Sequence, residues 1–109
     1  MRALKLNDNI IIYHTKWLSE SHAYACIAKG KTTMAWAVVD KYNMTIDITP
    51  QFGMSYGDTS WYMEKLLRFT AIWLRHDIRM NPKDLTLKLS TANPEMLSAK
   101  YFKNTVFFT

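Results

Sequence analysis

The sequence predicts an α+β domain in which an antiparallel sheet of about five to seven strands is covered on one face by a single long amphipathic helix. Short segments that alternate between apolar and polar residues lie on both sides of one segment, 58–80, whose apolar residues recur every three or four positions. The chain of 109 residues has only three Gly and three Pro and no repeat or linker. Residues 1–109 are therefore expected to form one domain.

The first and the middle strands are indicated by alternation and turn residues. Residues 2–6 alternate, residues 7–9 are Asn-Asp-Asn, and residues 10–14 are apolar and β-branched. Residues 44–48 alternate again before a proline. Each of these segments has the length and composition of a strand bounded by a turn.

Residues 22–29 and 32–40 are expected to form a hairpin about Gly30, since the second arm is rich in Val, Thr and Trp. The alternative for residues 20–29 is a helix that Ser19 caps and Gly30 ends, which the alanines of this segment favour. We favour the strand, and both interpretations stay open.

The long helix is expected to begin at a cap provided by Asp58, Thr59 or Ser60 and to end near residue 80, because Asn81 precedes a proline. At 3.6 residues per turn, one face is apolar. Its residues are Met63, Leu66, Leu67, Thr70, Leu74 and Ile78. After the helix, residues 84–89 alternate like a strand, residues 93–99 begin with a capped helical turn, and residues 101–108 are aromatic and β-branched like a last strand.

The aromatic residues are expected mainly in the core, because each buries a large apolar area. Alternation places Met34, Trp36 and Val38 on one face of their strand, which we expect the helix to cover. Trp17 and Trp73 are expected to be core residues as well.

A single cysteine and an unremarkable N-terminus predict an intracellular protein. Cys26 has no partner for an internal disulfide, and its neighbours are apolar, which raises the pKa of a thiol and favours an inert core role. The first residues lack the pattern of a signal peptide, and the uncharged segment 32–39 is too short to span a bilayer. We expect a reducing, cytoplasmic location and no membrane partner.

Positive charge gathers on the outer side of the predicted helix. The net charge is +5 and the isoelectric point is near 9.4, which favours acidic partners. Helical spacing brings four cations into one narrow arc opposite the apolar face, with Trp61 and Ile72 beside them. We call the cations the basic arc: Lys65, Arg68, Arg75 and Arg79. A solvated outer face is the other interpretation of this arc.

Two aromatic residues in the loop before the helix, Phe52 and Tyr56, are further candidates for partner binding, since aromatic residues often anchor interfaces. Core packing is the other interpretation for both. With Trp61 and the basic arc they complete the predicted partner-binding set.

No catalytic, metal or cofactor site is predicted. His14, His22 and His76 have no carboxylate or nucleophile placed beside them by spacing. Residues 25–32 match a loose phosphate-loop pattern, but the segment has one glycine and precedes a strand, so a hairpin turn explains it. Ligand spacings typical of metal sites do not occur.

The sequence therefore favours a non-enzymatic binding protein that covers an acidic site on a partner, through the basic arc and the loop before the helix. Small basic inhibitors or adaptors of nucleic-acid machinery, such as phage-encoded blockers of host complexes, form the class with which we associate it. Direct binding of nucleic acid is the alternative, and a small nuclease-like enzyme is the third possibility. The partner and the oligomeric state stay open.

Overall fold

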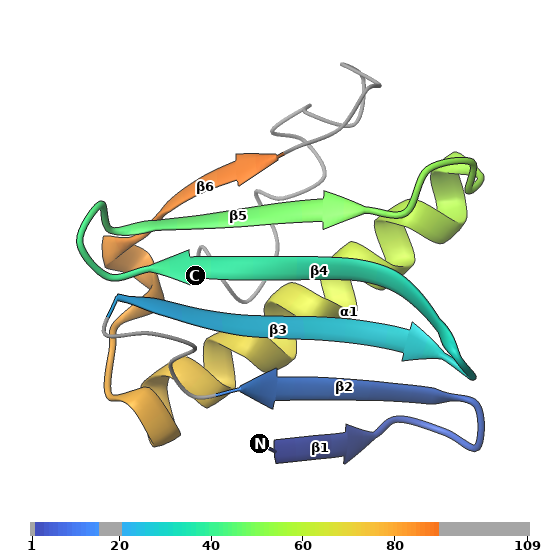
Figure 1. The fold of residues 1–109 in the computed structure, drawn as a ribbon, viewed down its shortest axis with the longest axis horizontal. Coiled ribbons are helices and arrows are strands. Elements are labelled where there is room, and N and C mark those ends of the chain that lie inside the picture. The colour runs from blue at the N-terminus through green and yellow to red at the C-terminus, as the bar shows by residue number, and fades with distance from the viewer. Residues whose placement is uncertain (1, 16–20, 90–109) are drawn as a thin grey trace.

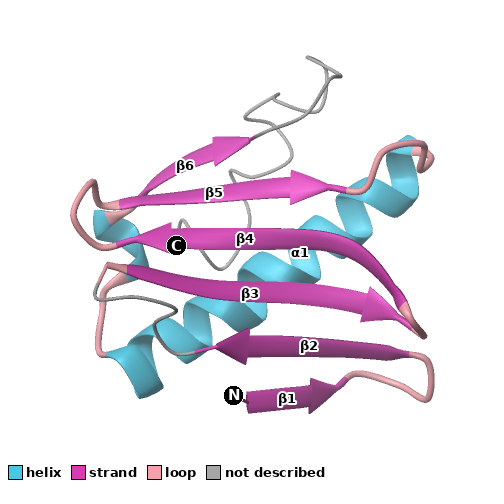
Figure 2. Cartoon of the chain, viewed as in Figure 1, coloured by secondary structure: helices cyan, strands magenta, loops and turns pink. Residues whose placement is uncertain are grey.

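A computed structural model of the chain describes residues 2–15 and 21–89. Its strands are β1 (Arg2–Lys5), β2 (Ile10–Thr15), β3 (His22–Lys29), β4 (Thr32–Asp40), β5 (Thr45–Pro50) and β6 (Thr86–Leu89). The helix α1 (Tyr56–Trp73) lies across one face of the sheet and continues into the π turn η1 (Leu74–Ile78), and the 3-10 turn η2 (Pro82–Asp84) follows (Figures 1 and 2). The predicted α+β fold, one long helix on a sheet, is confirmed.

The strands follow one another across the six-stranded sheet in chain order. Neighbours from β1 to β5 pair antiparallel, whereas β5 and β6 pair in parallel. A parallel pair needs a crossover connection, and α1 with its two following turns provides it. The sheet is thus antiparallel, as expected, except at its last pair.

Residues 22–29 form the strand β3, so the helical alternative is wrong. The backbone of β3 pairs with β2 on one side and with β4 on the other. Ala23 and Ala25, which favour a helix by intrinsic propensity, are fully buried on the face toward α1. Tertiary packing here outweighs a local preference of a few tenths of a kcal/mol per residue, on the order of the spread among ordinary residues.

The expectation that α1 covers Met34, Trp36 and Val38 is wrong for Trp36 and Val38, whereas Met34 is partly buried against the core, as expected. The helix packs instead over Ala35, Ala37 and Val39, which are fully buried. Trp36 and Val38 point to the opposite face of the sheet and are half-buried. The small alanines leave room for the large side chains of α1 to pack closely against the sheet. A Trp in the same row would occupy that room and prevent this close packing. Alternation separated Trp36 and Val38 from Ala37 and Val39 correctly, but it did not show which of the two sets is covered, and the β-bulge beside Met34 interrupts it.

The core lies between α1 and the sheet, and the expected apolar helix face is buried there. Met63, Leu66, Leu67, Thr70 and Leu74 are at most 1% exposed, and Ile78 is half-buried. The helix begins at Tyr56, a little earlier than expected, because Ser55 is the cap. Its Oγ accepts a hydrogen bond from the Asp58 N–H at 3.2 Å, which satisfies one free donor of the first turn.

The helix ends at Ile78 in a π turn, close to the expected end near residue 80. Arg79 follows in the left-handed conformation, with φ 61 and ψ 41. Asn81 then caps η2, since its Oδ1 accepts a hydrogen bond from the Lys83 N–H at 3.0 Å. The stop at Asn81 and Pro82 is therefore located correctly, while the change of helix type before it is not visible in the sequence pattern.

The strand expected at 84–89 is present as β6, which begins two residues later at Thr86. Trp73 is 3% exposed, as expected for a core residue. The elements expected at 93–99 and 101–108, and the position of Trp17, lie outside the described residues.

Candidate docking surface

The outward side of α1 combines apolar and cationic side chains. Its half-buried or exposed members are Trp61, Lys65, Arg68, Ile72 and Arg75. Trp61 and Ile72 are 38% and 40% exposed, which is high for large apolar side chains. The Lys65 Nζ lies 5.7 Å from the centroid of the Trp61 ring, within the range of cation–π attraction. The buried Tyr62 ring meets the same indole edge to face at 5.0 Å, so the exposed Trp61 is held in place from two sides.

An ion pair within α1 neutralises the middle of the basic arc. The Arg68 Nη2 donates to Glu64 Oε1 at 2.9 Å, with both side chains about two-fifths exposed (41% and 38%). Exposed pairs at this helical spacing contribute only about 0.3–0.5 kcal/mol. Arg68 can still contact a partner, but the net charge of the Glu64 and Arg68 pair is zero. The arc is therefore less positive than its cations alone suggest.

Arg75 and Arg79 lie on and after the π turn, at the C-terminal end of the helix. Both are exposed. Together with Met80, Asn81 and Lys83 they line a concavity of about 520 Å³. Lys83 was not among the predicted binding residues, because it follows the helix and no helical spacing relates it to the arc. A basic residue just after a helix stop is the only sequence signal for it.

Phe52 and Tyr56 lie at the other end of α1. Phe52 is 90% exposed in the loop between β5 and α1, beside Gly53 at φ 89. Tyr56 is the first helical residue and is half-buried. At 1.5 Å per residue, the 18 residues of α1 span about 27 Å. The predicted binding residues are therefore spread along the helix: two at its start, Arg75 and Arg79 at its end, and the rest between them.

His14 is buried between the sheet and α1, where its ring contacts other side chains. It is 3% exposed beneath α1, its Nε2 lies 3.2 Å from the Thr70 Oγ1, and its ring stacks on Trp73 at a centroid distance of 4.7 Å. His76 lies exposed on the π turn.

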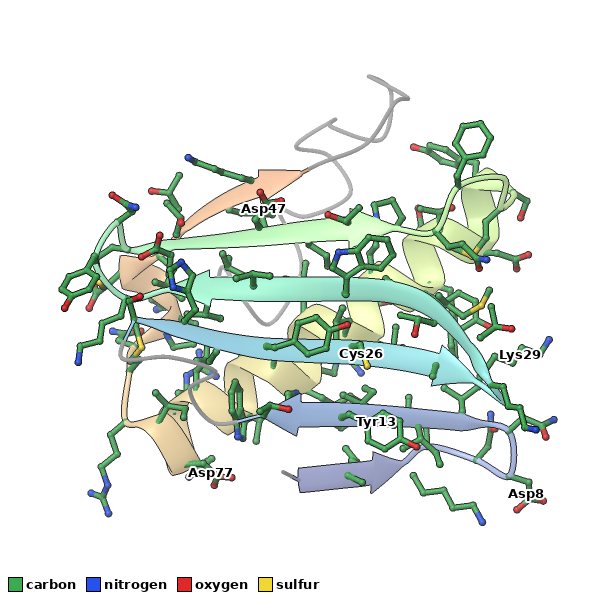
Figure 3. The ribbon with its side chains drawn as sticks, viewed as in Figure 1. Asp8, Tyr13, Cys26, Lys29, Asp47 and Asp77 are labelled. Atoms are coloured by element: carbon green, nitrogen blue, oxygen red, sulfur yellow. The ribbon has the colours of Figure 1, made fainter. Side chains whose placement is uncertain are left out.

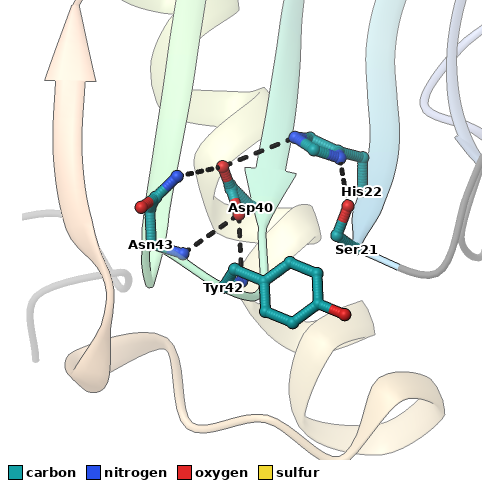
Figure 4. A network of polar contacts seen from close by, with 5 residues as sticks. All are labelled: Ser21, His22, Asp40, Tyr42 and Asn43. Carbon is teal, nitrogen blue, oxygen red and sulfur yellow. Dashed lines mark hydrogen bonds and ion pairs between the residues drawn. The ribbon is translucent and has the colours of Figure 1, made fainter.

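His22 lies in a polar network at the turn between β4 and β5 (Figure 4). Its Nδ1 lies 2.6 Å from the Ser21 Oγ and its Nε2 3.4 Å from Asp40 Oδ2. Asp40 also accepts hydrogen bonds from the backbone of Asn43 and Tyr42 and from the side chain of Asn43. Asn43, first through its backbone N–H, holds the pKa of the Asp40 carboxyl below its ordinary value. The network thus closes a turn around an ionised carboxylate.

Sequence reasoning missed the pairing of His22 with Asp40 because a β-bulge sets it. The register of β3 and β4 shifts between Ile27 and Ala28, which makes His22 the partner of Asp40. The hairpin turn alone would predict Val39 in that place. An irregularity of one residue leaves no mark in the alternation that a sequence shows.

The face of the sheet turned away from α1 has a second concavity, of about 460 Å³. Its lining includes His22, Trp36, Asp40, Asp47 and Lys88. Figure 3 labels Asp47 together with Tyr13 and Cys26, whose places in the strand register put them on this same face. Cross-strand neighbours form rows here, and Tyr13, Cys26 and Trp36 make up one such row.

Cys26 is the one free cysteine, and it is buried. Burial, more than any other influence, raises the pKa of its thiol, and burial likewise raises the pKa of Tyr24. The expected burial and raised pKa of Cys26 are confirmed, but the side chain lies on the face of the sheet away from the helix and not in the core cluster.

Two further properties of the described residues concern metal ligands and membrane-spanning helices. Within residues 2–15 and 21–89, no group of three potential metal ligands converges. Over the same residues, no helix has both the length and the apolar character needed to cross a bilayer. Neither a family model, nor a curated protein, nor a solved structure matches this chain.

Proposed function

We propose that the protein is a non-enzymatic binding protein that docks the outward side of α1 on an acidic surface of a protein partner and thereby covers a site there. The observation that carries the proposal is the exposed pair Trp61 and Ile72 on a helix face that also presents Lys65 and Arg75. Aromatic and Arg side chains are the usual anchors of protein interfaces. Small inhibitors or adaptors of nucleic-acid machinery, such as phage-encoded blockers of host complexes, are the class we associate with it.

Direct nucleic-acid binding through the same face is the alternative, and the charges favour a protein partner. Glu64 pairs with Arg68, which leaves Lys65 and Arg75 as the net charges of this face along α1. They are ten positions apart in the chain, or about 15 Å along a helix. Nucleic-acid binding normally relies on many phosphate contacts, each of which steepens the salt dependence by about 0.9 in the logarithmic slope.

The test begins with capture of partners from lysate on the immobilised protein, with and without nuclease treatment. The captured partner is then bound to the double variant Lys65→Glu/Arg75→Glu. These two positions are preferable to Arg68, whose reversal would place a second acid beside Glu64 and change the helix itself. We expect the double reversal to abolish binding while the melting temperature stays nearly unchanged.

The matched control reverses two exposed cations at the turn between β3 and β4, outside α1: Lys29→Glu/Lys31→Glu. This variant has the same net charge as the test variant, so it separates a local contact from a general charge effect. If both variants bind equally well, the outward face of α1 is only a solvated surface. If nuclease removes all capture and affinity falls steeply with salt, the partner is nucleic acid.

A second candidate function is acid–base chemistry in the concavity on the sheet face turned away from α1. The observation that favours it is the approach of His22 to Asp40 at 3.4 Å within a lined concavity, the combination that general acid–base catalysis requires. It ranks second because Asp40 is engaged by the turn. Cleavage of RNA or DNA by the purified protein, lost in His22→Ala at unchanged stability, would establish this candidate and contradict the non-enzymatic proposal.

A further inference from the structure

The concavity after the π turn gathers positive charge, and the described residues that line it include no acidic side chain. Arg75, Arg79 and Lys83 line it together with Met80 and Asn81. No ion pair involves any of the three cations among the described residues, in contrast to Arg68. Three adjacent cations repel one another, so this arrangement is unfavourable for folding alone and becomes favourable when an anion lies between them.

The backbone conformation of Arg79 is a second observation that favours a ligand at this concavity. Its φ of 61 is a conformation that glycine adopts at little cost and that is strained for other residues. Met44 also has a positive φ, of 52, but its side chain packs against the core. Arg79 is exposed and has no such packing. An arginine where the chain favours glycine needs another role for its side chain.

The π turn orients these side chains. The Leu74 carbonyl accepts hydrogen bonds from the N–H of Arg79 and from that of Met80, the second at 2.8 Å. This widened turn takes Arg79 out of the regular spacing of α1 and brings it to the side where Asn81 and Lys83 follow. Single π turns within helices are frequent at functional sites.

Compensation of the helix dipole is the competing explanation, because cations are favourable at a helix C-terminus. It fits Arg75, which lies in the last turn. It does not fit Lys83, which belongs to the separate turn η2 beyond the cap. It also gives no reason for an arginine at the strained position 79, where a glycine would end the helix more favourably.

We propose that this concavity binds a phosphate monoester group. A phosphate monoester has nearly two negative charges at neutral pH and three acceptor oxygens, which matches a site of three cations better than a carboxylate with one charge. Arginine forks donate two hydrogen bonds to such a group, and lysine adds a point charge. The site goes beyond the proposed function, since it binds the group in the absence of any protein partner.

The test is a titration of the isotopically labelled protein followed by amide NMR shifts. The probes are inorganic phosphate, N-acetyl phosphoserine amide and adenosine 5′-monophosphate, each compared with acetate at equal ionic strength. We expect saturable shifts confined to residues 74–83 with the phosphates and none with acetate. Tighter binding of the phosphoserine probe than of phosphate would assign the source to a modified protein, and tighter binding of the nucleotide would assign it to a nucleotide.

Two variants and one control make the result decisive. Arg79→Gly and Lys83→Gln are each expected to weaken phosphate binding about tenfold, the loss typical of one charged hydrogen bond. Lys65→Gln, which removes a cation of the arc outside the concavity, is expected to leave it unchanged. Equal affinity of Arg79→Gly and the wild type, or equal shifts with acetate, would overturn the proposal. Because glycine suits this backbone, loss of binding in Arg79→Gly is not loss of the fold.

Discussion

Replacing Leu67 with Ala measures how strongly α1 is packed on the sheet. Leu67 is fully buried in the core cluster that joins the helix to the strands. The change removes three carbon atoms, which at about 0.8 kcal/mol per buried methylene corresponds to about 2.4 kcal/mol of transfer free energy. The cavity adds to this, because the strands around it cannot fully collapse. We expect the free energy of unfolding to fall by about 3–5 kcal/mol, and Leu74→Ala to behave alike.

Urea titration followed by tryptophan fluorescence provides the measurement, with the slope against urea checked for constancy. Ile72→Ala is the matched control, since it also removes three carbons but from a side chain that is 40% exposed. It should change the free energy of unfolding by less than about 1 kcal/mol. Losses below about 0.5 kcal/mol in both leucine variants, or a loss at Ile72 equal to theirs, would refute the packing of this helix face.

Three further predictions concern particular side chains. Arg79→Gly should raise the free energy of unfolding by about 1 kcal/mol in denaturant titrations, because the left-handed backbone is relieved of strain; a loss of stability would show that the Arg79 side chain has a structural role. Cys26 has a raised pKa in the folded state, so above pH 9.0, its ordinary value, the unfolded chain releases its proton first and stability falls as pH rises. Cys26→Ala should weaken this alkaline decline. The pKa of Asp40 is lowered in the folded state, so its contribution to stability is complete above its ordinary pKa of 3.8 and is lost as the pH falls from there through the lower folded-state pKa. Acid titration should therefore show a shallower decline of stability in Asp40→Asn than in the wild type. Identical acid curves would contradict the turn network.

The sequence was sufficient for the elements whose signal is periodic. Leu67 and Leu74 fall on the predicted helix face because 3.6-residue spacing over five turns leaves little ambiguity. Strand β3 was harder to predict from the sequence, because its alanines are compatible with a helix and also with a strand on which a helix packs closely. The covered side of β4 could not be predicted: alternation separates Trp36 from Ala37, but which of the two faces α1 depends on the space between the layers.

The candidate site depended on features of single residues. Exposure of Trp61 and Ile72 was predictable from the helical wheel, whereas the pairing of Arg68 with Glu64 is one of several rotamer outcomes at that spacing. The concavity at Arg79 arises from one wide turn and one positive φ, and the meeting of His22 with Asp40 arises from one bulge. Such irregularities are decided by the packed structure as a whole, so local patterns contain no trace of them.

The parallel pairing of β6 has a consequence for the order of folding. Strands β1 to β5 pair with neighbours in the chain through short connections, so their contacts form with little loss of loop entropy. Thr86, by contrast, pairs with Thr45, 41 residues earlier (86 − 45), and reaches it only after the intervening chain has crossed the sheet. We expect β6 to join last during folding and to open first under native conditions. Amide hydrogen exchange should therefore protect Leu87 less than the central strands β3 and β4, and equal protection would show that the crossover forms together with the rest of the sheet.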